Sequence, residues 1–205
     1  MATSTSPFMT PQQRTTEREA KRAAVLRAAV QMFNERGFHN TSLDEVAASL
    51  GITKPTIYHY LGNKDRVLLE CVTHGLHALL SAAHQSRATP GKGADRLRAF
   101  LLSYAENILN DFGRCVIRTS EDALGVESRK QFRELKRKID MAMRELIQEA
   151  ISDGSIAQVD PQYLAFTLAG ALNWSAQWHN PDGLQSPSEV AEQLVDILAQ
   201  GFLPR

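Results

Sequence analysis

The sequence is poor in the features that hold secreted proteins together or carry common enzyme chemistry. It has only two cysteines in 205 residues, too few for a disulfide framework. It has no apolar run of about twenty residues and no signal-peptide pattern. The motifs G-x-S-x-G, G-x-G-x-x-G and G-x-x-x-x-G-K-[ST] are absent, so nucleophile elbows and phosphate-cradling loops have no support. These absences lead us to expect a cytoplasmic protein that crosses no membrane, uses no cofactor and is not an enzyme.

Side chains that bind metals or react with oxidants are few and unfavourably spaced. Cys71, His74 and His77 recur at intervals of three residues. On a helix, however, a separation of six residues rotates a side chain by about 240°, so Cys71 and His77 face apart. Basic neighbours could lower the thiol pKa of Cys115, but a lone cysteine is more often a buried core residue. The sequence predicts no metal site and favours packing roles for both cysteines.

Charge is balanced over the whole chain but not along it. The 23 Lys and Arg residues equal the 23 Asp and Glu residues in number. Residues 1–67 nevertheless hold nine basic and six acidic side chains, a net charge of 9 − 6 = +3, so the remainder carries −3. A basic N-terminal part on a slightly acidic body is steered toward nucleic acid by its own field. The distribution of charge is therefore compatible with a DNA-binding head.

The segment SLDEVAASLGITKPTIYHYLGNK, which starts at Ser42, follows the local rules of a helix-turn-helix. Ser42 and Glu45 have the spacing of a capping box, which predicts the start of a helix. Gly51 stands where the end of that helix needs a positive φ. Thr53 is placed to cap the next helix, and Pro55 lies in its first turn, where a missing N–H costs nothing.

The second helix of this segment carries hydrogen-bonding and aromatic groups on its outer face. Ile57 and Leu61 are its two inward-facing apolar residues. The outward groups belong to Lys54, Thr56, Tyr58, His59, Tyr60 and Lys64. A recognition helix lies in the major groove with its first residues at the base edges and flanking groups on phosphates. The pattern therefore favours DNA binding over the alternative of a plain helical hairpin with some of the rings in the core.

Residues 17–70 resemble the N-terminal domain of the TetR family of transcriptional regulators, most closely in the run TKPTIYHY at residues 53–60 and in Asn63-Lys64. The resemblance implies that Lys54, Pro55, Thr56 and His59 approach bases. It implies that Ser42, Tyr58, Tyr60 and Lys64 approach phosphates. Thr53 completes the set of residues that we assign to the DNA interface.

Two carboxylates depart from what DNA binding requires. Asp44 and Glu45 occupy the first turn of the helix that precedes the recognition helix. There they favour the helix dipole but repel phosphate. We therefore expect no base reading from that first helix.

Composition and periodicity divide the chain into three parts. Residues 1–16 are rich in Ser, Thr, Pro and Gln, which predicts a disordered arm, more plausibly a solvated tail than a DNA contact. Residues 17–62 are expected to form the three-helix DNA-binding domain, with a first helix over about Glu17 to Arg36. Residues 63–205 are expected to form a helical domain for effector binding and dimerisation. The predicted fold class is all-α.

The C-terminal part retains helical periodicity throughout. The predicted helices include a helix from Asn63 and the ranges 97–112, 127–152, 161–179 and 187–202. The last two are more apolar than a single surface helix needs, so either they belong to one core or a partner subunit covers them. Since one recognition helix reads only a few base pairs, we expect a homodimer on a palindromic operator. Its predicted interface residues are Phe166, Leu194, Ile197 and Leu198.

The effector is the least determined partner. The run NWSAQW at residues 173–178, PDG at 181–183 and SEVA at 188–191 are similar to the corresponding segment of the acyl-CoA-responsive branch of the family. That similarity implies a hydrophobic small molecule, with an acyl-CoA thioester of lipid or steroid metabolism as the best candidate. The proposed pocket residues are Phe100, Tyr104, Phe112, Arg118, Met141, Trp174 and Trp178, although core packing explains each one equally well.

These expectations combine into a regulator, most simply a repressor that its ligand releases from DNA. Effector binding would change the separation of the two DNA-binding heads. The alternative from another class is an all-helical dimeric lipid carrier or enzyme whose first three helices are only structural. The two differ in one property, because a carrier would not bind duplex DNA at physiological salt.

Overall fold

The computed structural model describes residues 10–202, and within that range all regular secondary structure is helical. The α-helices are α1 (Pro11–Arg36), α2 (Leu43–Ser49), α3 (Lys54–Leu61), α4 (Lys64–Ser86), α5 (Gly93–Leu109), α6 (Asp111–Arg118), α7 (Val126–Ser152), α8 (Pro161–Trp178) and α9 (Pro187–Phe202). A short 3-10 helix, η1 (Glu121–Ala123), joins α6 to α7. The prediction of an all-α fold is confirmed. No helix in the described range is long and apolar enough to cross a bilayer.

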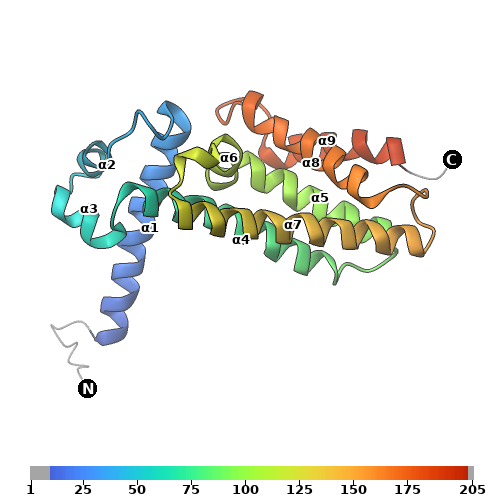
Figure 1. Ribbon diagram of the computed structural model, residues 1–205, viewed down its shortest axis with the longest axis horizontal. Helices are drawn as coiled ribbons and strands as arrows, with labels where there is room; N and C mark the ends of the chain where they lie inside the picture. The colour runs from blue at the N-terminus through green and yellow to red at the C-terminus, as the bar shows by residue number, and fades with distance from the viewer. Residues whose placement is uncertain (1–9, 203–205) are drawn as a thin grey trace, which may run out of the picture.

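The molecule is elongated, with α1–α3 forming a head at one end and α4–α9 forming the body (Figure 1). The head closes around the apolar stripe of α1, and its core is shared by all three helices. The core residues of the head are Val25, Ala29, Val30 and Phe33 of α1, Leu43, Val46 and Ala47 of α2, and Ile57 and Leu61 of α3. The inward-facing pair predicted for α3, Ile57 and Leu61, is therefore confirmed, whereas Tyr60, predicted to face outward, packs partly against the core.

The helix starts and turns of the head follow the sequence signals. The side chain of Ser42 accepts from the backbone of Glu45, and the Glu45 carboxylate accepts from the backbone of Ser42, so the predicted capping box is present. Gly51 has a φ of +64°, in the left-handed region that glycine adopts without steric cost. The capping box fixes where α2 begins, and Gly51 permits the tight turn between α2 and α3.

The first helix is longer than predicted. It begins at Pro11 instead of Glu17, because Thr10 and Gln13 form a second capping box and Pro11 supplies the favourable first residue. The expectation of a disordered arm is therefore wrong for residues 11–16. Residues 1–9 lie outside the described range. In Figure 1, the first turns of α1 extend beyond the rest of the head.

The predicted helix over residues 97–112 is in fact two elements. It begins earlier, at Gly93, and ends at Leu109, where Asn110 starts α6 by accepting a hydrogen bond from the backbone of Gly113. The remaining predictions for the body, 127–152, 161–179 and 187–202, match α7, α8 and α9 to within one residue. The short helix α6 packs against α1, α4, α5 and α8, so it lies at the junction of head and body.

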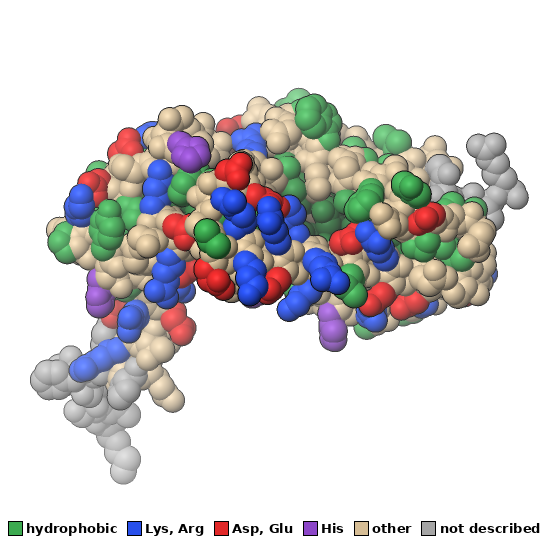
Figure 2. All heavy atoms as spheres, viewed as in Figure 1, with side chains coloured by type: hydrophobic (Ala, Val, Ile, Leu, Met, Phe, Trp, Pro, Cys, Tyr) green, Lys and Arg blue, Asp and Glu red, His purple; other side chains and the backbone are tan. Residues whose placement is uncertain are grey.

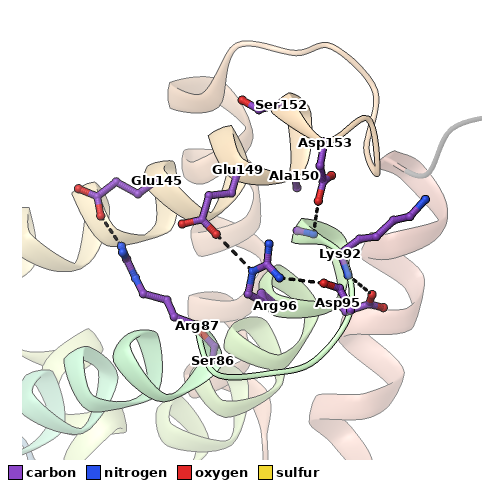
Figure 3. A network of polar contacts seen from close by, with 12 residues as sticks. Ser86, Arg87, Lys92, Asp95, Arg96, Glu145, Glu149, Ala150, Ser152 and Asp153 are labelled. Atoms are coloured by element: carbon purple, nitrogen blue, oxygen red, sulfur yellow. Dashed lines mark hydrogen bonds and ion pairs between the residues drawn. The ribbon is translucent and has the colours of Figure 1, made fainter.

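At the far end of the body, polar contacts hold the loop between α4 and α5 against the end of α7 (Figure 3). The backbone N–H of Gly93 donates to Asp153 at 2.6 Å, and Arg96 pairs with Glu149 at 3.3 Å. Arg87 pairs with Glu145 on the same side of α7. Exposed pairs of this kind contribute little stability individually. Their effect is to fix where α5 begins relative to α7.

Candidate DNA interface and effector cavity

The outer face of α3 carries its polar groups as the sequence predicts. Lys54, Pro55 and His59 are exposed, and Tyr58 is exposed to 44%. Thr56 and Tyr60 are half-buried, and the Tyr60 ring meets His59 edge-on at a centroid distance of 5.6 Å. The helix therefore presents ammonium, hydroxyl, phenol and imidazole groups on one face at the end of the molecule.

The N-terminus of α3 is arranged differently from the simple cap that we predicted. The Thr53 side chain makes no hydrogen bond to the helix backbone. Its hydroxyl instead lies 2.8 Å from the hydroxyl of Thr56. The first turn is closed by the backbone instead, because Pro55 has no N–H and the N–H of Thr56 donates to the carbonyl of Thr53 at 3.0 Å.

The two carboxylates of α2 are neutralised by neighbouring cations. Asp44 accepts from the Lys54 ammonium at 2.8 Å, and this contact raises the pKa of Lys54. Glu45 is held by the capping box with Ser42, which lowers its pKa, and Arg36 lies 3.5 Å from it. The acids therefore offset positive charge beside the recognition helix, and Asp44 engages a predicted base-reading group.

Lys64, at the start of α4, is partly enclosed. Its ammonium lies 4.2 Å from the centroid of the Phe38 ring and 3.4 Å from the carbonyl oxygen of His39. This burial lowers the pKa of Lys64. Phe38 and His39, in the turn before α2, were not among the predicted interface residues. They restrict the Lys64 side chain, so less conformational entropy would be lost when it binds DNA.

The body contains an open cavity of about 550 Å³ between α4, α5, α6, α7 and α8. Its apolar wall includes Leu76, Leu79, Val116, Ile139, Met143, Ala165 and Ala169. Its polar part is a hydrogen bond from the Tyr104 hydroxyl to Asn173 at 2.9 Å. Burial raises the pKa of Tyr104 to about 12, so the phenol stays neutral. The cavity is suited to an elongated apolar group that ends near one polar pair.

Of the seven predicted ligand residues, only Tyr104 lies on this wall. Phe100 is fully buried and packs its ring against Tyr104, while Phe112 packs against His74. The expected aromatic lining is thus replaced largely by aliphatic residues. Phe166, predicted for the dimer interface, does line the cavity.

Three of the predicted ligand residues point outward. Trp174 is 67% exposed and Trp178 is 51% exposed, both on the outer side of α8, and Met141 is 49% exposed on α7. Helical geometry explains the difference, because residues four apart share a face and the face of α8 that carries both tryptophans is turned away from the core. These residues do not line the cavity.

Arg118 connects the head to the body. Its guanidinium donates to the carbonyl of Asn34 in α1 at 2.9 Å and to the carbonyl of Ala176 in α8 at 3.2 Å. The amide of Asn34 donates in turn to the carbonyl of Asp111 at 2.8 Å. Arg118 therefore acts as a structural link between the domains and does not reach the cavity of about 550 Å³.

The cavity wall includes two exposed cations of α7 that the sequence did not single out as ligand residues. Lys136 and Arg137 of α7 line the cavity together with Asp140. Asp140 is paired with Arg144 at 2.8 Å, so it does not neutralise the two cations. In Figure 2, Lys and Arg side chains gather over the middle of α7. The basic run of α7 was visible in the sequence, but its proximity to a cavity was not.

Large apolar side chains lie exposed on α8 and on α9. They are Tyr163 (71% exposed), Phe166 (54%), Trp174 (67%) and Trp178 (51%) of α8 and Ile197 (67%) of α9. Leu194 and Leu198, predicted for the same interface, are half-buried. We call the five exposed residues, Tyr163, Phe166, Trp174, Trp178 and Ile197, the outer stripe. Several large apolar side chains exposed on neighbouring turns of one helix are typical of an interaction surface.

Both cysteines are buried and protonated. Burial raises the pKa of Cys71 well above its ordinary value and that of Cys115 to about 11. Neither environment favours the reactive thiolate. Within the described range, no group of three metal-ligating side chains comes together.

Comparison with known proteins matches both parts of the chain. Residues 25–71 match the family model described as bacterial regulatory proteins of the tetR family. Residues 90–202 match the tetracyclin repressor-like C-terminal domain, which covers more than half of the chain. The two matches fall on the head and on the body.

Individual relatives agree with these matches. The HTH-type transcriptional repressor KstR2 of Mycolicibacterium smegmatis is 26% identical over 186 residues, 89% of this chain and 91% of its own. A transcriptional regulator from Thermobifida fusca is 32% identical, with a TM-score of 0.68, covering 89% of this chain and 98% of that one. AibR, solved with isovaleryl coenzyme A and operator DNA, is 25% identical, with a TM-score of 0.75, covering 86% and 97%. The first two are named as a transcriptional repressor and a transcriptional regulator, and AibR was solved with operator DNA.

Proposed function

The chain belongs to the TetR family of transcriptional regulators, and we propose that it is a cytoplasmic repressor that binds a palindromic operator as a homodimer and is released by an acyl-CoA or similar effector. The single observation that carries the effector part is the open apolar cavity with Lys136 and Arg137 at its mouth. We place the boundary between DNA-binding head and effector domain at residues 62 and 63, between α3 and α4.

The DNA interface that we propose is the outer face of α3 and its flanks. Lys54, Pro55, Thr56 and His59 would meet bases, and Thr53 would support the first turn. Ser42, Tyr58, Tyr60 and Lys64 would meet phosphates. The exposure of the α3 side chains and the fixed position of Lys64 support this assignment. Sequencing the DNA that the purified protein retains from its own genome tests it: we expect palindromic sites, whereas a lipid carrier would retain no specific DNA.

We propose that the outer stripe is covered by a second copy of the chain. Phe166, Trp174, Trp178 and Ile197 would form the centre of the interface, with Leu194 and Leu198 at its inner edge. Aromatic residues are enriched in such interfaces. Two heads on one two-fold axis would read the two half-sites of a palindrome.

The effector assignment follows from the chemistry of the cavity. An acyl chain would contact the aliphatic wall, and its polar link would meet Tyr104 and Asn173. Phosphates at the other end would meet Lys136 and Arg137. AibR, whose structure was solved with isovaleryl coenzyme A, supports this class of ligand because it is similar over most of the chain.

The affinity for acyl-CoA should rise with acyl length until the cavity is full. Burying one methylene contributes about 0.8 kcal/mol, a factor of about four in the dissociation constant. The change Ala169→Trp fills part of the cavity and should shorten the best chain by several carbons without weakening DNA binding. Isothermal titration against a series of saturated acyl-CoAs measures how affinity depends on chain length and which chain length binds best in each variant. The change Gln148→Trp, on an exposed position of α7 outside the cavity, is the control.

Removing the carboxylate beside Lys54 should strengthen DNA binding. In Asp44→Asn, the ammonium of Lys54 loses its partner and becomes available to DNA, and one charge that repels phosphate is removed. We expect operator affinity to rise by about three- to tenfold and the salt dependence to steepen by about one unit. Gel-shift titrations at several salt concentrations test this, with Glu35→Gln in α1 as the charge-matched control. Unchanged affinity in Asp44→Asn would place Lys54 away from DNA.

A further inference from the structure

The Glu121 carboxylate of η1 pairs with two cations of α7, one of which lines the effector cavity. The Glu121 side chain accepts from Arg133 at 2.6 Å with one oxygen and from Lys136 at 3.0 Å with the other. These contacts lower the pKa of Glu121, so the carboxylate stays charged. Lys136 also lines the effector cavity. The carboxylate of η1 is therefore bound to a cation that lines the cavity.

The same face of α7 offers further positive charge. Lys130, Arg133 and Arg137 line a groove of about 460 Å³ along the helix, and Arg137 also belongs to the cavity wall. Lys130 and Arg137 have no hydrogen-bond or ion-pair partner among residues 10–202. Lys130, Arg133 and Arg137 follow one another at intervals of three and four residues. They therefore lie on one side of the helix, within about 11 Å of one another along its axis.

The acidic groups around this face leave it positive. Arg129 donates to the carbonyls of Glu121 and Leu124 and lies 3.6 Å from the Asp122 carboxylate. The charges of Arg129 and Asp122 therefore offset each other. Glu134 lines the groove and is the other carboxylate there. Four cations therefore face two carboxylates, Glu121 and Glu134, beside the cavity mouth.

The arrangement of Glu121 resembles that of a bound phosphate. Two of its oxygens each meet a different cation, one guanidinium and one ammonium, as two oxygens of a phosphate do. We propose that Arg133 and Lys136, with Lys130 and Arg137 beside them, form a binding site for the polyphosphate end of the effector, and that Glu121 is an internal competitor which that group replaces. This inference rests on the proposed function for the apolar part of the ligand.

Displacement of Glu121 would be felt at the DNA-binding head. The corner formed by η1 and the start of α7 has a second attachment, in which Asp65 accepts from the backbone of Gly125 at 2.7 Å and from the Ser128 hydroxyl at 2.6 Å. Asp65 lies in the first turn of α4, directly after the recognition helix. Glu121 and Asp65 thus hold two sides of one corner, and loss of the Glu121 side-chain contacts leaves it held by Asp65 of α4 and by Arg129.

Isothermal titration with inorganic pyrophosphate tests the anion site without the acyl group. In Glu121→Gln, the competing charge is removed, and pyrophosphate should bind about three- to tenfold more tightly than to the unmodified protein. In Arg133→Gln with Lys136→Gln, affinity should fall by about tenfold or more. Glu127→Gln is the matched control, because Glu127 is exposed in the first turn of α7 and has no partner in the described range. Circular dichroism checks that each variant is folded.

Operator release by oleoyl-CoA provides the second readout. Because the polyphosphate end of oleoyl-CoA would occupy the same anion site, the concentration that half-releases the operator should fall in Glu121→Gln in the same direction as the pyrophosphate dissociation constant. Equal pyrophosphate affinity in Glu121→Gln and Glu127→Gln, or no measurable binding in any form, would overturn the anion site even if oleoyl-CoA still releases DNA. If pyrophosphate binding follows these residues but no acyl-CoA affects the operator, the anion site stands and the proposed effector is wrong.

Discussion

Replacing Trp174 and Ile197 together with glutamate should make the protein monomeric and reduce operator affinity by at least about 100-fold. Both side chains are more than half exposed on the outer stripe, so the monomer can keep them in water without rearranging its core. In a dimer, the same positions would bury carboxylates against apolar surface, which costs several kcal/mol. A monomer holds only one half-site and loses the gain from simultaneous binding. Sedimentation velocity and gel-shift titration measure the two effects.

The control for this variant adds the same charge elsewhere. Gln131 and Gln148 are exposed on α7, so Gln131→Glu with Gln148→Glu should remain dimeric and keep its operator affinity to within a few-fold. A soluble, folded dimer of the Trp174→Glu, Ile197→Glu protein with unchanged affinity would place the subunit interface on another surface.

Adding a single methyl group at Gly113 should destabilise the junction of head and body. A Cβ at this position would lie 1.9 Å from the carbonyl oxygen of Asn107 and 2.9 Å from the Cα of Ile108, both backbone atoms of α5. Neither can move without shifting the helix, so Gly113→Ala should lower the free energy of unfolding by about 1–3 kcal/mol and weaken operator binding. Thermal unfolding followed by circular dichroism measures the first effect.

Gly125→Ala serves as the comparison for this substitution. The nearest atoms to a Cβ at Gly125 lie 3.5 Å away, in the Asp65 carboxylate, which is ordinary van der Waals contact. Its φ of −60° is also accessible to alanine. We expect a change of a few tenths of a kcal/mol at this helix start. Equal stability of the two variants would contradict the close approach of α6 to α5.

The head could be predicted from the sequence because its rules are local. The capping box of Ser42 and Glu45, the positive φ of Gly51 and the inward pair Ile57 and Leu61 each depend on residues a few positions apart. The start of α1 was missed although Thr10 and Gln13 carry the same capping signal as Ser42 and Glu45. The polar composition of residues 1–16 favours disorder, whereas the capping box of Thr10 and Gln13 favours a helix, and the capping box decides the structure.

The effector cavity could not be predicted because it depends on how helices are turned toward one another. An apolar residue on a helix can face the core, a cavity or another subunit, and periodicity does not distinguish these environments. Trp174 and Trp178 were therefore assigned to a pocket, although they lie on the outer stripe. Phe166 was assigned to the interface and also lines the cavity.

The polar contacts of the body could not be predicted from the sequence for a related reason. The basic run of α7 has the composition of a solvated face, and only the fold brings Lys136 next to the cavity and Glu121 next to Arg133. Arg118 was expected to meet a ligand, but backbone carbonyls of two distant helices take up its hydrogen bonds. Contacts between residues more than 50 positions apart have no local signature.

The central claim, a DNA-binding dimer released by an amphipathic thioester, is tested most directly by fluorescence anisotropy of a labelled operator. Adding oleoyl-CoA below its micelle concentration should empty the operator, whereas free CoA, acetyl-CoA and a detergent of matched chain length should leave it occupied. The account predicts that the half-release concentration falls as the acyl chain lengthens. Operator occupancy that no thioester changes, with folded dimer present throughout, would contradict it.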